Sequence, residues 1–205
     1  LQAVEKKDRY FEESLKNLGS FYARRGVWYQ AEPYFRERLK RVEARRGTNH
    51  METAVALFSH GQSLQQLYRY KSAETELRRA EHTARWKLGR HSVSAGYCKA
   101  LLGRLYLCMN RNEEAAEYLG QGLTQMGKFK RTTRFVDDGI SHRRQEKDSV
   151  FHPDHEDGVA VRIDYATALI RLGRPTEAAV PLAEARTLLV GKLKYALPDY
   201  YIQRQ

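Results

Sequence analysis

The stretch Leu15-Lys-Asn-Leu-Gly-Ser-Phe-Tyr22, followed by Ala31-Glu-Pro-Tyr-Phe35, decides the fold of this chain. Related stretches begin at Leu57, Leu102 and Tyr165. Their markers keep one spacing of 42 residues, both for the glycines Gly19, Gly61 and Gly103 and for the alanines Ala31, Ala73 and Ala115. The matching Ala178 comes 63 residues after Ala115, so an insertion separates the third and fourth stretches. A regular period of this length predicts a repeat architecture rather than an ordinary helical bundle.

Each repeat is expected to form two amphipathic helices. In the first repeat Leu15, Leu18 and Tyr22 recur at helical spacing. Gly26, directly after two arginines, is typical of a helix end. A second apolar face runs from Ala31 to Val42, and no segment alternates as a β-strand does. The sequence therefore predicts an all-α fold: a right-handed α-solenoid of about four helix pairs, each contacting mainly its neighbours, with small residues where two helices cross.

The order Leu18-Gly19, Tyr22, Ala31 and Phe35 resembles the tetratricopeptide repeat. The 42-residue period and the linker Gly47-Thr-Asn-His50 resemble the kinesin light chain type of this repeat. On this basis the solenoid spans residues 1–192, with repeats near 12–50, 54–92, 96–128 and 159–192, an inserted loop at 129–158, and a capping or tail segment at 193–205. One departure is Tyr68, which stands where the first and fourth repeats have Gly26 and Gly173.

The resemblance implies a protein-binding scaffold whose first helices line a concave groove. By register, the groove candidates are Lys16, Arg24, Phe58, Gln62, Gln65, Tyr97, Arg104, Ile163 and Arg171. This apolar and basic lining suits an amphipathic helix or an acidic extended peptide. It lacks the Asn-rich lining of kinesin light chains, and only Lys16 matches the carboxylate clamp of chaperone-binding members. Burial against a neighbouring repeat or against the protein's own tail is the alternative for Phe58 and Tyr97.

The inserted loop has a basic front and an acidic rear. We expect its basic and aromatic residues to contact RNA phosphates or an acidic subunit; they are Lys128, Lys130, Arg131, Arg134, Phe135, Arg143 and Arg144. A solvated surface loop is the alternative, although long loops inside compact domains are usually functional or disordered.

The second helices of the first two repeats are also rich in cations. These are Arg36, Arg38, Lys40, Arg41, Arg45 and Arg46 in one, and Arg78, Arg79, Arg85, Lys87 and Arg90 in the other. Interspersed glutamates would form ion pairs along each helix, which favours a solvated convex face. The competing hypothesis is a basic ridge that pairs with RNA or an acidic subunit, since the whole chain has 36 Lys and Arg against 25 Asp and Glu, a net charge of +11.

No catalytic residue, metal site or cofactor is predicted. Glycine-rich nucleotide-binding motifs are absent, and His152 and His155 flank a proline without a third metal ligand. Cys98 and Cys108 are expected to be small packing groups on one helix. Two cysteines and no Asn-x-Ser/Thr acceptor disfavour a secreted disulfide scaffold. No stretch approaches the roughly 18 apolar residues of a membrane span.

The sequence therefore predicts a non-catalytic protein-interaction scaffold, a subunit of a large multiprotein or ribonucleoprotein assembly. The alternatives are an RNA-contacting ribosomal or RNA-processing protein and a soluble adaptor for short peptides. Strong basicity, and a first residue Leu1 that is not Met, suit a mature mitochondrial protein, with the cytoplasm as the competing compartment.

Overall fold

A computed structural model describes residues 2–89, 92–127 and 156–196. These residues form helices and turns and contain no β-strand. The helices are α1 (Gln2–Arg24), α2 (Trp28–Arg46), α3 (Met51–Gln66), α4 (Tyr70–Leu88), α5 (Val93–Cys108), α6 (Asn112–Gly127), α8 (Glu156–Arg171) and α9 (Pro175–Ala196). None of the helices in these ranges has the length and apolar character needed to cross a membrane.

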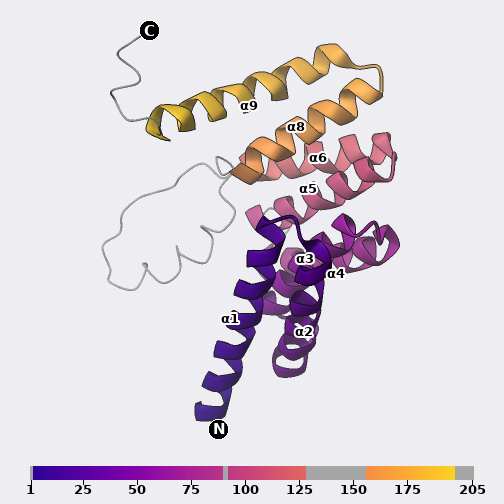
Figure 1. Cartoon of the computed structure of the whole chain (residues 1–205). Helices are drawn as coiled ribbons and strands as arrows, with labels where there is room; N and C mark the ends of the chain where they lie inside the picture. Colours follow the sequence, from indigo (N-terminus) through magenta and orange to yellow (C-terminus); the bar gives the residue numbers. More distant parts are fainter. Residues whose placement is uncertain (1, 90–91, 128–155, 197–205) are drawn as a thin grey trace, which may run out of the picture.

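The helices stack as four antiparallel pairs, α1–α2, α3–α4, α5–α6 and α8–α9, with α1 at one end and α9 at the other (Figure 1). The second helix of each pair packs against the first helix of the next. First helices also touch across repeats, α3 with α5 and α5 with α8, whereas α4 and α6 hardly meet. This arrangement confirms the predicted α-solenoid, and it leaves the second helices splayed apart on one side of the array.

The marker glycines lie where two helices of a pair cross closely. A Cβ atom added at Gly19 would lie 2.7 Å from the ring of Phe35, one at Gly61 3.0 Å from Leu77, and one at Gly103 2.6 Å from Leu119. These three partners are themselves spaced by 42 residues. The marker alanines Ala31, Ala73 and Ala115 are all 0% exposed. The predicted close crossings are therefore confirmed, and each is filled by one large side chain from the facing helix.

The turn inside each pair places one residue in the left-handed region, at Gly26, Tyr68, Asn110 and Gly173. The residue that follows it donates a backbone hydrogen bond to the carbonyl five residues before it: Val27 to Tyr22, Arg69 to Leu64, Arg111 to Tyr106, and Arg174 to Leu169, at 2.9–3.0 Å. This is the bond that closes a Schellman motif, which favours glycine at the left-handed position. Tyr68, at φ 60° and 79% exposed, occupies it against that preference.

Two helix ends differ from the expected repeat limits. α1 begins at Gln2, ahead of residue 12, and α9 runs to Ala196, beyond residue 192 and into the expected tail segment. α9 continues through Gly191, and no proline follows Pro181 until Pro198.

Candidate protein-interaction surfaces

The predicted groove residues of the second and third repeats lie between first helices. The rings of Phe58 in α3 and Tyr97 in α5 stack with centroids 5.3 Å apart. The side-chain amide of Gln65 donates a hydrogen bond to Cys108 Sγ at 3.3 Å. Gln65 and Tyr97 are each only 4% exposed. The structure therefore leaves almost nothing of these two side chains for a partner and matches the alternative of burial for Tyr97.

The predicted residues of the third and fourth repeats hold α8 against α5. Arg104 Nε donates to Asp164 Oδ2 at 2.6 Å, and both side chains are about one-quarter exposed. Arg171 donates to the carbonyl oxygen of Leu107 at 3.2 Å. Two of the basic groups that we expected to meet a partner thus bond within the solenoid.

The remaining groove candidates are more accessible. Lys16 is partly exposed and pairs with Glu13 at 2.6 Å. Arg24 and Ile163 are exposed, and Gln62 is half-buried. Their role in partner binding stays a prediction. The predicted contacts in the inserted loop, Lys128, Lys130, Arg131, Arg134, Phe135, Arg143 and Arg144, lie outside the described residues, as do His152 and His155.

A hollow lies on the side of the second helices. It is a groove of about 790 Å³ between α4 and α6, and Lys99 and Leu102 of α5 form its floor. We call it the back groove. A second hollow of about 700 Å³ adjoins it across α6, shares Lys99, Glu117 and Gln121 with it, and reaches Tyr165 and Arg174. The back groove exists because α4 and α6 both pack on α5 and hardly on each other.

The charges that line the back groove are mainly positive: Arg78, Arg79, Arg85 and Lys99 against Glu81 and Glu117. Arg78 pairs with Glu74 and Arg79 with Glu43. Lys99 donates to the neutral amide of Gln121 at 2.9 Å, and Arg85 has no partner within the described part of the chain. Among the residues that the structure describes, no carboxylate therefore pairs with Lys99 or Arg85 to cancel its positive charge.

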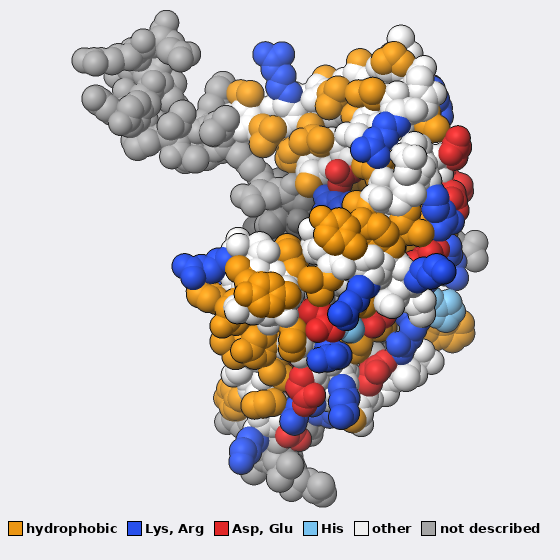
Figure 2. Space-filling view, turned by 45° about the vertical axis from the view of Figure 1, so that its right-hand side comes forward, with side chains coloured by type: hydrophobic (Ala, Val, Ile, Leu, Met, Phe, Trp, Pro, Cys, Tyr) orange, Lys and Arg blue, Asp and Glu red, His pale blue; other side chains and the backbone are white. Residues whose placement is uncertain are grey.

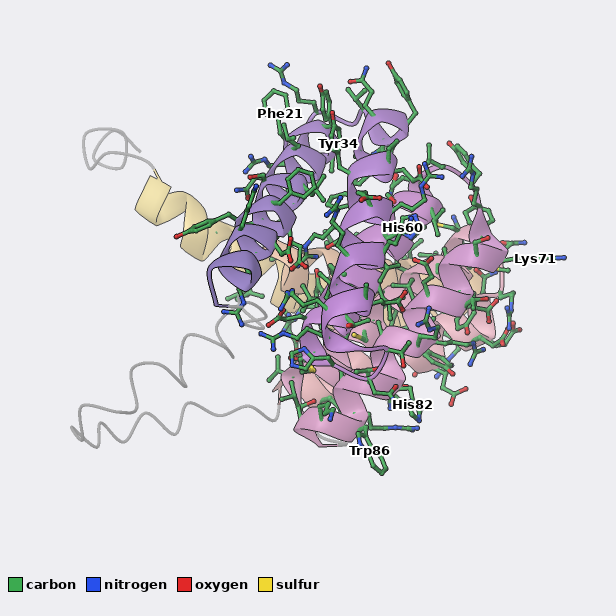
Figure 3. All side chains as sticks on the ribbon, turned by 90° about the horizontal axis from the view of Figure 1, so that it is seen from below. Phe21, Tyr34, His60, Lys71, His82 and Trp86 are labelled. Carbon is green, nitrogen blue, oxygen red and sulfur yellow. The ribbon has the colours of Figure 1, made fainter. Side chains whose placement is uncertain are left out.

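A small pocket at the end of α4 adjoins the back groove. Asn49, His82, Thr83 and Trp86 line it, and Trp86 is 76% exposed. Figure 3 shows His82 and Trp86 side by side at an edge of the molecule. Figure 2 shows lysine and arginine side chains interleaved with acidic ones, so the predicted ridge is not a uniform cationic surface. Arg38, which we placed on that ridge, is only 8% exposed and lies inside the protein.

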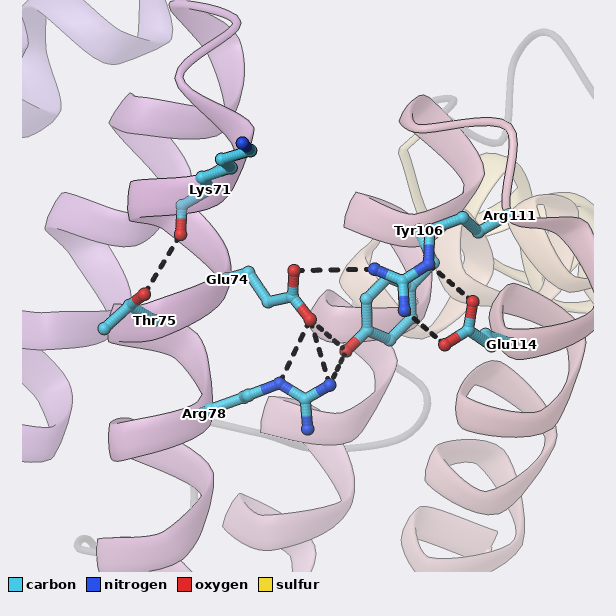
Figure 4. A network of polar contacts seen from close by, with 7 residues as sticks. All are labelled: Lys71, Glu74, Thr75, Arg78, Tyr106, Arg111 and Glu114. Atoms are coloured by element: carbon cyan, nitrogen blue, oxygen red, sulfur yellow. Dashed lines mark hydrogen bonds and ion pairs between the residues drawn. The ribbon is translucent and has the colours of Figure 1, made fainter.

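A polar network borders the back groove and joins the second and third repeats (Figure 4). The hydroxyl of Tyr106 donates to Glu74 Oε1 at 3.0 Å and accepts from Arg78 at 2.7 Å. Arg111 lies 3.5 Å from Glu74, pairs with Glu114, and stacks its guanidinium 4.4 Å from the centre of the Tyr106 ring. Burial raises the pKa of Glu74, but hydrogen bonds from Arg78 and Tyr106 lower it by more, so this pKa lies below its ordinary value.

A different buried network joins the first and second repeats. His60 is 6% exposed, with Nδ1 at 2.9 Å from Glu76 and Nε2 at 3.2 Å from Glu32. A neutral imidazole has only one N–H, so only the protonated ring donates to both carboxylates. Burial lowers the pKa of His60, whereas its bonds to Glu76 and Glu32 raise it by more, and the pKa lies above its ordinary value.

The described residues hold no cluster of three or more His, Cys, Asp and Glu side chains that could bind a metal ion. Cys98 is buried, and burial raises the pKa of its thiol to about 12, so it is protonated near neutral pH. Cys108 is exposed, unlike the packing group we expected.

Comparison with known proteins agrees with this geometry. Residues 10–85, which span the first two helix pairs, match the family model of the tetratricopeptide repeat. These residues therefore belong to the tetratricopeptide repeat family. No curated protein matches it.

Solved structures extend the likeness to the rest of the solenoid. The chain is similar to BtubC (BKLC) from P. vanneervenii, with a TM-score of 0.68 and 15% identity over 88% of this chain. It spans only 64% of that protein's chain. A putative kinesin light chain from Podosopora anserina with nearly identical TPR-like repeats gives a TM-score of 0.53 at 16% identity, over 89% of this chain and 96% of that one. MamA gives 0.54 at 20% identity, over 95% of this chain and 87% of that one. The predicted kinesin-light-chain-like repeat is thus confirmed at the level of the fold.

Sequence reasoning missed several residues that the structure brings forward. Arg38 lies three residues after Phe35 and four before Val42, so helical spacing alone assigns it to the apolar face of α2. The hydrogen bonds of His60 and Lys99 could not be predicted from helical spacing, because their partners lie on other helices.

Proposed function

We propose that this chain is a structural subunit of a large assembly and that it holds an acidic segment of a partner protein in the back groove. Tetratricopeptide repeats indicate a protein–protein interaction scaffold, and their fold is typically non-catalytic. The assembly and the partner's acidity are our additions. They are supported by a net charge of +11 and by the composition of the back groove.

The proposal rests on two properties of the back groove, its volume and its unpaired positive charges. The back groove has room for a peptide segment at about 790 Å³, and Lys99 and Arg85 face no carboxylate partner in the described residues. In the first helices, by contrast, Arg104 of α5 bonds to α8, and Arg171 of α8 bonds to α5. An acidic segment would meet the unpaired cations, and the exposed Trp86 beside them would add an aromatic contact at the rim.

The test is native purification of the tagged full chain from cells that normally make it. Particle size is measured at low and high salt, with and without nuclease, and the proteins that travel with the chain are identified. We expect a large particle that survives nuclease. The double variant Arg85→Glu and Lys99→Glu should leave that particle, because it places negative charge opposite the acidic partner.

The matched control is Lys40→Glu with Lys87→Glu. It makes the same change in net charge on exposed side chains of α2 and α4 that do not line the back groove. If both double variants dissociated from the particle to the same extent, this would contradict a role for the groove and indicate an effect of overall charge. A chain that runs alone in every condition would exclude a permanent subunit and favour an adaptor that binds short peptides transiently.

RNA is the second candidate partner, favoured by the net charge. It predicts release by nuclease and a steep loss of binding with salt, because bound cations displace counterions from phosphates. A mitochondrial location is part of the same proposal, and fractionation of the tagged chain tests it against the cytoplasm.

A further inference from the structure

A small pocket between α1, α2 and the start of α3 has an unusual polar lining. Its volume is about 240 Å³, and it lies apart from the back groove. The residues around it are Arg9, Glu12, Glu13, Arg38, Arg45 and Glu52, with Val42 as the apolar member. We call it the arginine pocket.

Arg38 reaches this pocket with its hydrogen bonds unmade. The residue is 8% exposed, and its Nε and Nη1 atoms are buried without an acceptor among the described residues. Nη1 of Arg45 is buried and likewise unpartnered there. Burial lowers the pKa of Arg38, and the charges of Glu13, Glu12 and Glu52 act in the opposite direction. A buried cation whose N–H groups lack acceptors is costly, so the pocket favours any ligand that supplies oxygen atoms.

The nearby carboxylates do not accept hydrogen bonds from Arg38, because each of them is paired with another cation. Arg45 donates to Glu12 at 2.9 and 2.5 Å and to Glu52 at 2.6 Å. Glu13 pairs with Lys16 at 2.6 Å. Arg46 also approaches Glu52, at 3.5 Å.

Three arginines and three glutamates line the pocket, so their formal charges balance. The glutamates are already paired with other cations, so they do not accept the unmade hydrogen bonds of Arg38 and Arg45.

We propose that the arginine pocket binds a small oxyanion, a phosphoryl or carboxylate group, through Arg38 and the unpartnered Nη1 of Arg45. A guanidinium presents its N–H groups as a planar fork that matches two oxygens of such a group. A phosphoryl group also supplies several strong acceptor oxygens to N–H groups that lack an acceptor. This site is independent of the partner that we propose for the back groove.

The test is titration of the full chain with inorganic phosphate, sulfate or acetate at constant ionic strength, with chloride as the balancing anion. Thermal unfolding and isothermal titration calorimetry report binding. We expect a saturable rise in Tm with an oxyanion that chloride does not produce. A larger response to phosphate and sulfate identifies a phosphoryl-type group, and a larger response to acetate identifies a carboxylate.

Variants separate the site from general salt effects. Arg38→Met should be at least as stable as the parent chain without oxyanion, because it removes unpaired buried donors, and it should lose the response to the anion. Arg38→Lys keeps the charge but not the fork, and we expect binding at least tenfold weaker. Arg36→Met, an exposed position on the same helix, is the matched control and should keep the full response.

Two outcomes would overturn the proposal. One is a parent chain whose Tm responds to phosphate, sulfate and acetate no more than to chloride. The other is an Arg38→Met variant that folds and keeps the response. Loss of binding in Arg38→Lys with the fold intact would support the site even if Arg38→Met failed to fold.

Discussion

The two junctions that lead into and out of the second repeat occupy equivalent positions and use different chemistry. Glu32 and Glu74 lie 42 residues apart, and each has an arginine four residues later. Glu32 faces the buried ring of His60 at the first junction, whereas Glu74 meets Tyr106 and Arg111 at the second. The repeat period therefore specifies where a carboxylate stands but not its partner, and only the first junction uses a partner that titrates near neutral pH.

Removing the centre of the second junction should have the largest effect. Tyr106 is 0% exposed, so Tyr106→Ala leaves a cavity, and we expect it to lower the free energy of unfolding by about 3 to 5 kcal/mol. Urea denaturation measures this value. The control is Tyr29→Ala at a 68% exposed position, which should change stability by no more than about 0.5 kcal/mol. Equal losses in the two variants would show that Tyr106 does not hold the junction.

At the first junction we expect His60→Leu to cost about 2 to 3 kcal/mol near pH 7. The variant copies Leu102, the equivalent residue one repeat later, but leaves Glu32 and Glu76 without their shared cation. Adding Glu76→Gln should recover part of the loss, since it removes one of the two charges. His82→Leu, at an exposed histidine, is the control. A double variant no more stable than His60→Leu would mean that lost packing, rather than unpaired charge, is responsible.

Raising the pH should have a smaller effect, because it removes only the proton of His60 at the first junction. The pKa of His60 is raised above its ordinary value near 6.5. Its contribution to stability is therefore complete below about pH 6.5 and is lost as the pH rises through the higher pKa of the folded state. Urea midpoints measured from about pH 6 to about pH 9 in phosphate-free buffer should fall through this step.

His60→Gln should remove the step, whereas Tyr106→Phe should keep it, because the network at the second junction has no group that titrates in this range. A step that persists in His60→Gln would assign it to another residue.

The smallest expected change concerns the turn of the second repeat. Tyr68→Gly should raise stability by about 0.5 to 1 kcal/mol. Glycine removes the backbone strain at φ 60°, but it also increases the conformational entropy of the unfolded chain, which offsets part of the gain. Gly26→Ala should lower stability by about 1 kcal/mol at the equivalent turn, where φ is 74°. Thermal and urea unfolding compare the two. A destabilising Tyr68→Gly would indicate that the contact of Tyr68 with Tyr70 outweighs the strain.

The fold could be predicted because its determinants are local and recur. Gly103 and Leu119, for example, have the same spacing as Gly19 and Phe35, so one crossing predicts the next. The turn residues Gly26 and Gly173 likewise marked the ends of first helices.

The candidate surfaces were harder to predict because they depend on contacts that register does not reveal. Arg104 was correctly assigned to a first helix, but its availability depends on Asp164, which lies beyond the insertion. The positions of Lys99 and Arg85 around one hollow follow from the splay of α4 and α6, which no single helix encodes.

The nearest-neighbour stacking of the helix pairs also has a mechanical consequence. Such an array deforms like springs in series, because strain at one junction reaches the next only through the repeat between them. The junction held by His60 owes part of its stiffness to a proton, and the junction held by Tyr106 and Arg111 does not. A change of pH around the pKa of His60 should therefore alter the stiffness of the first junction and leave that of the second junction unchanged.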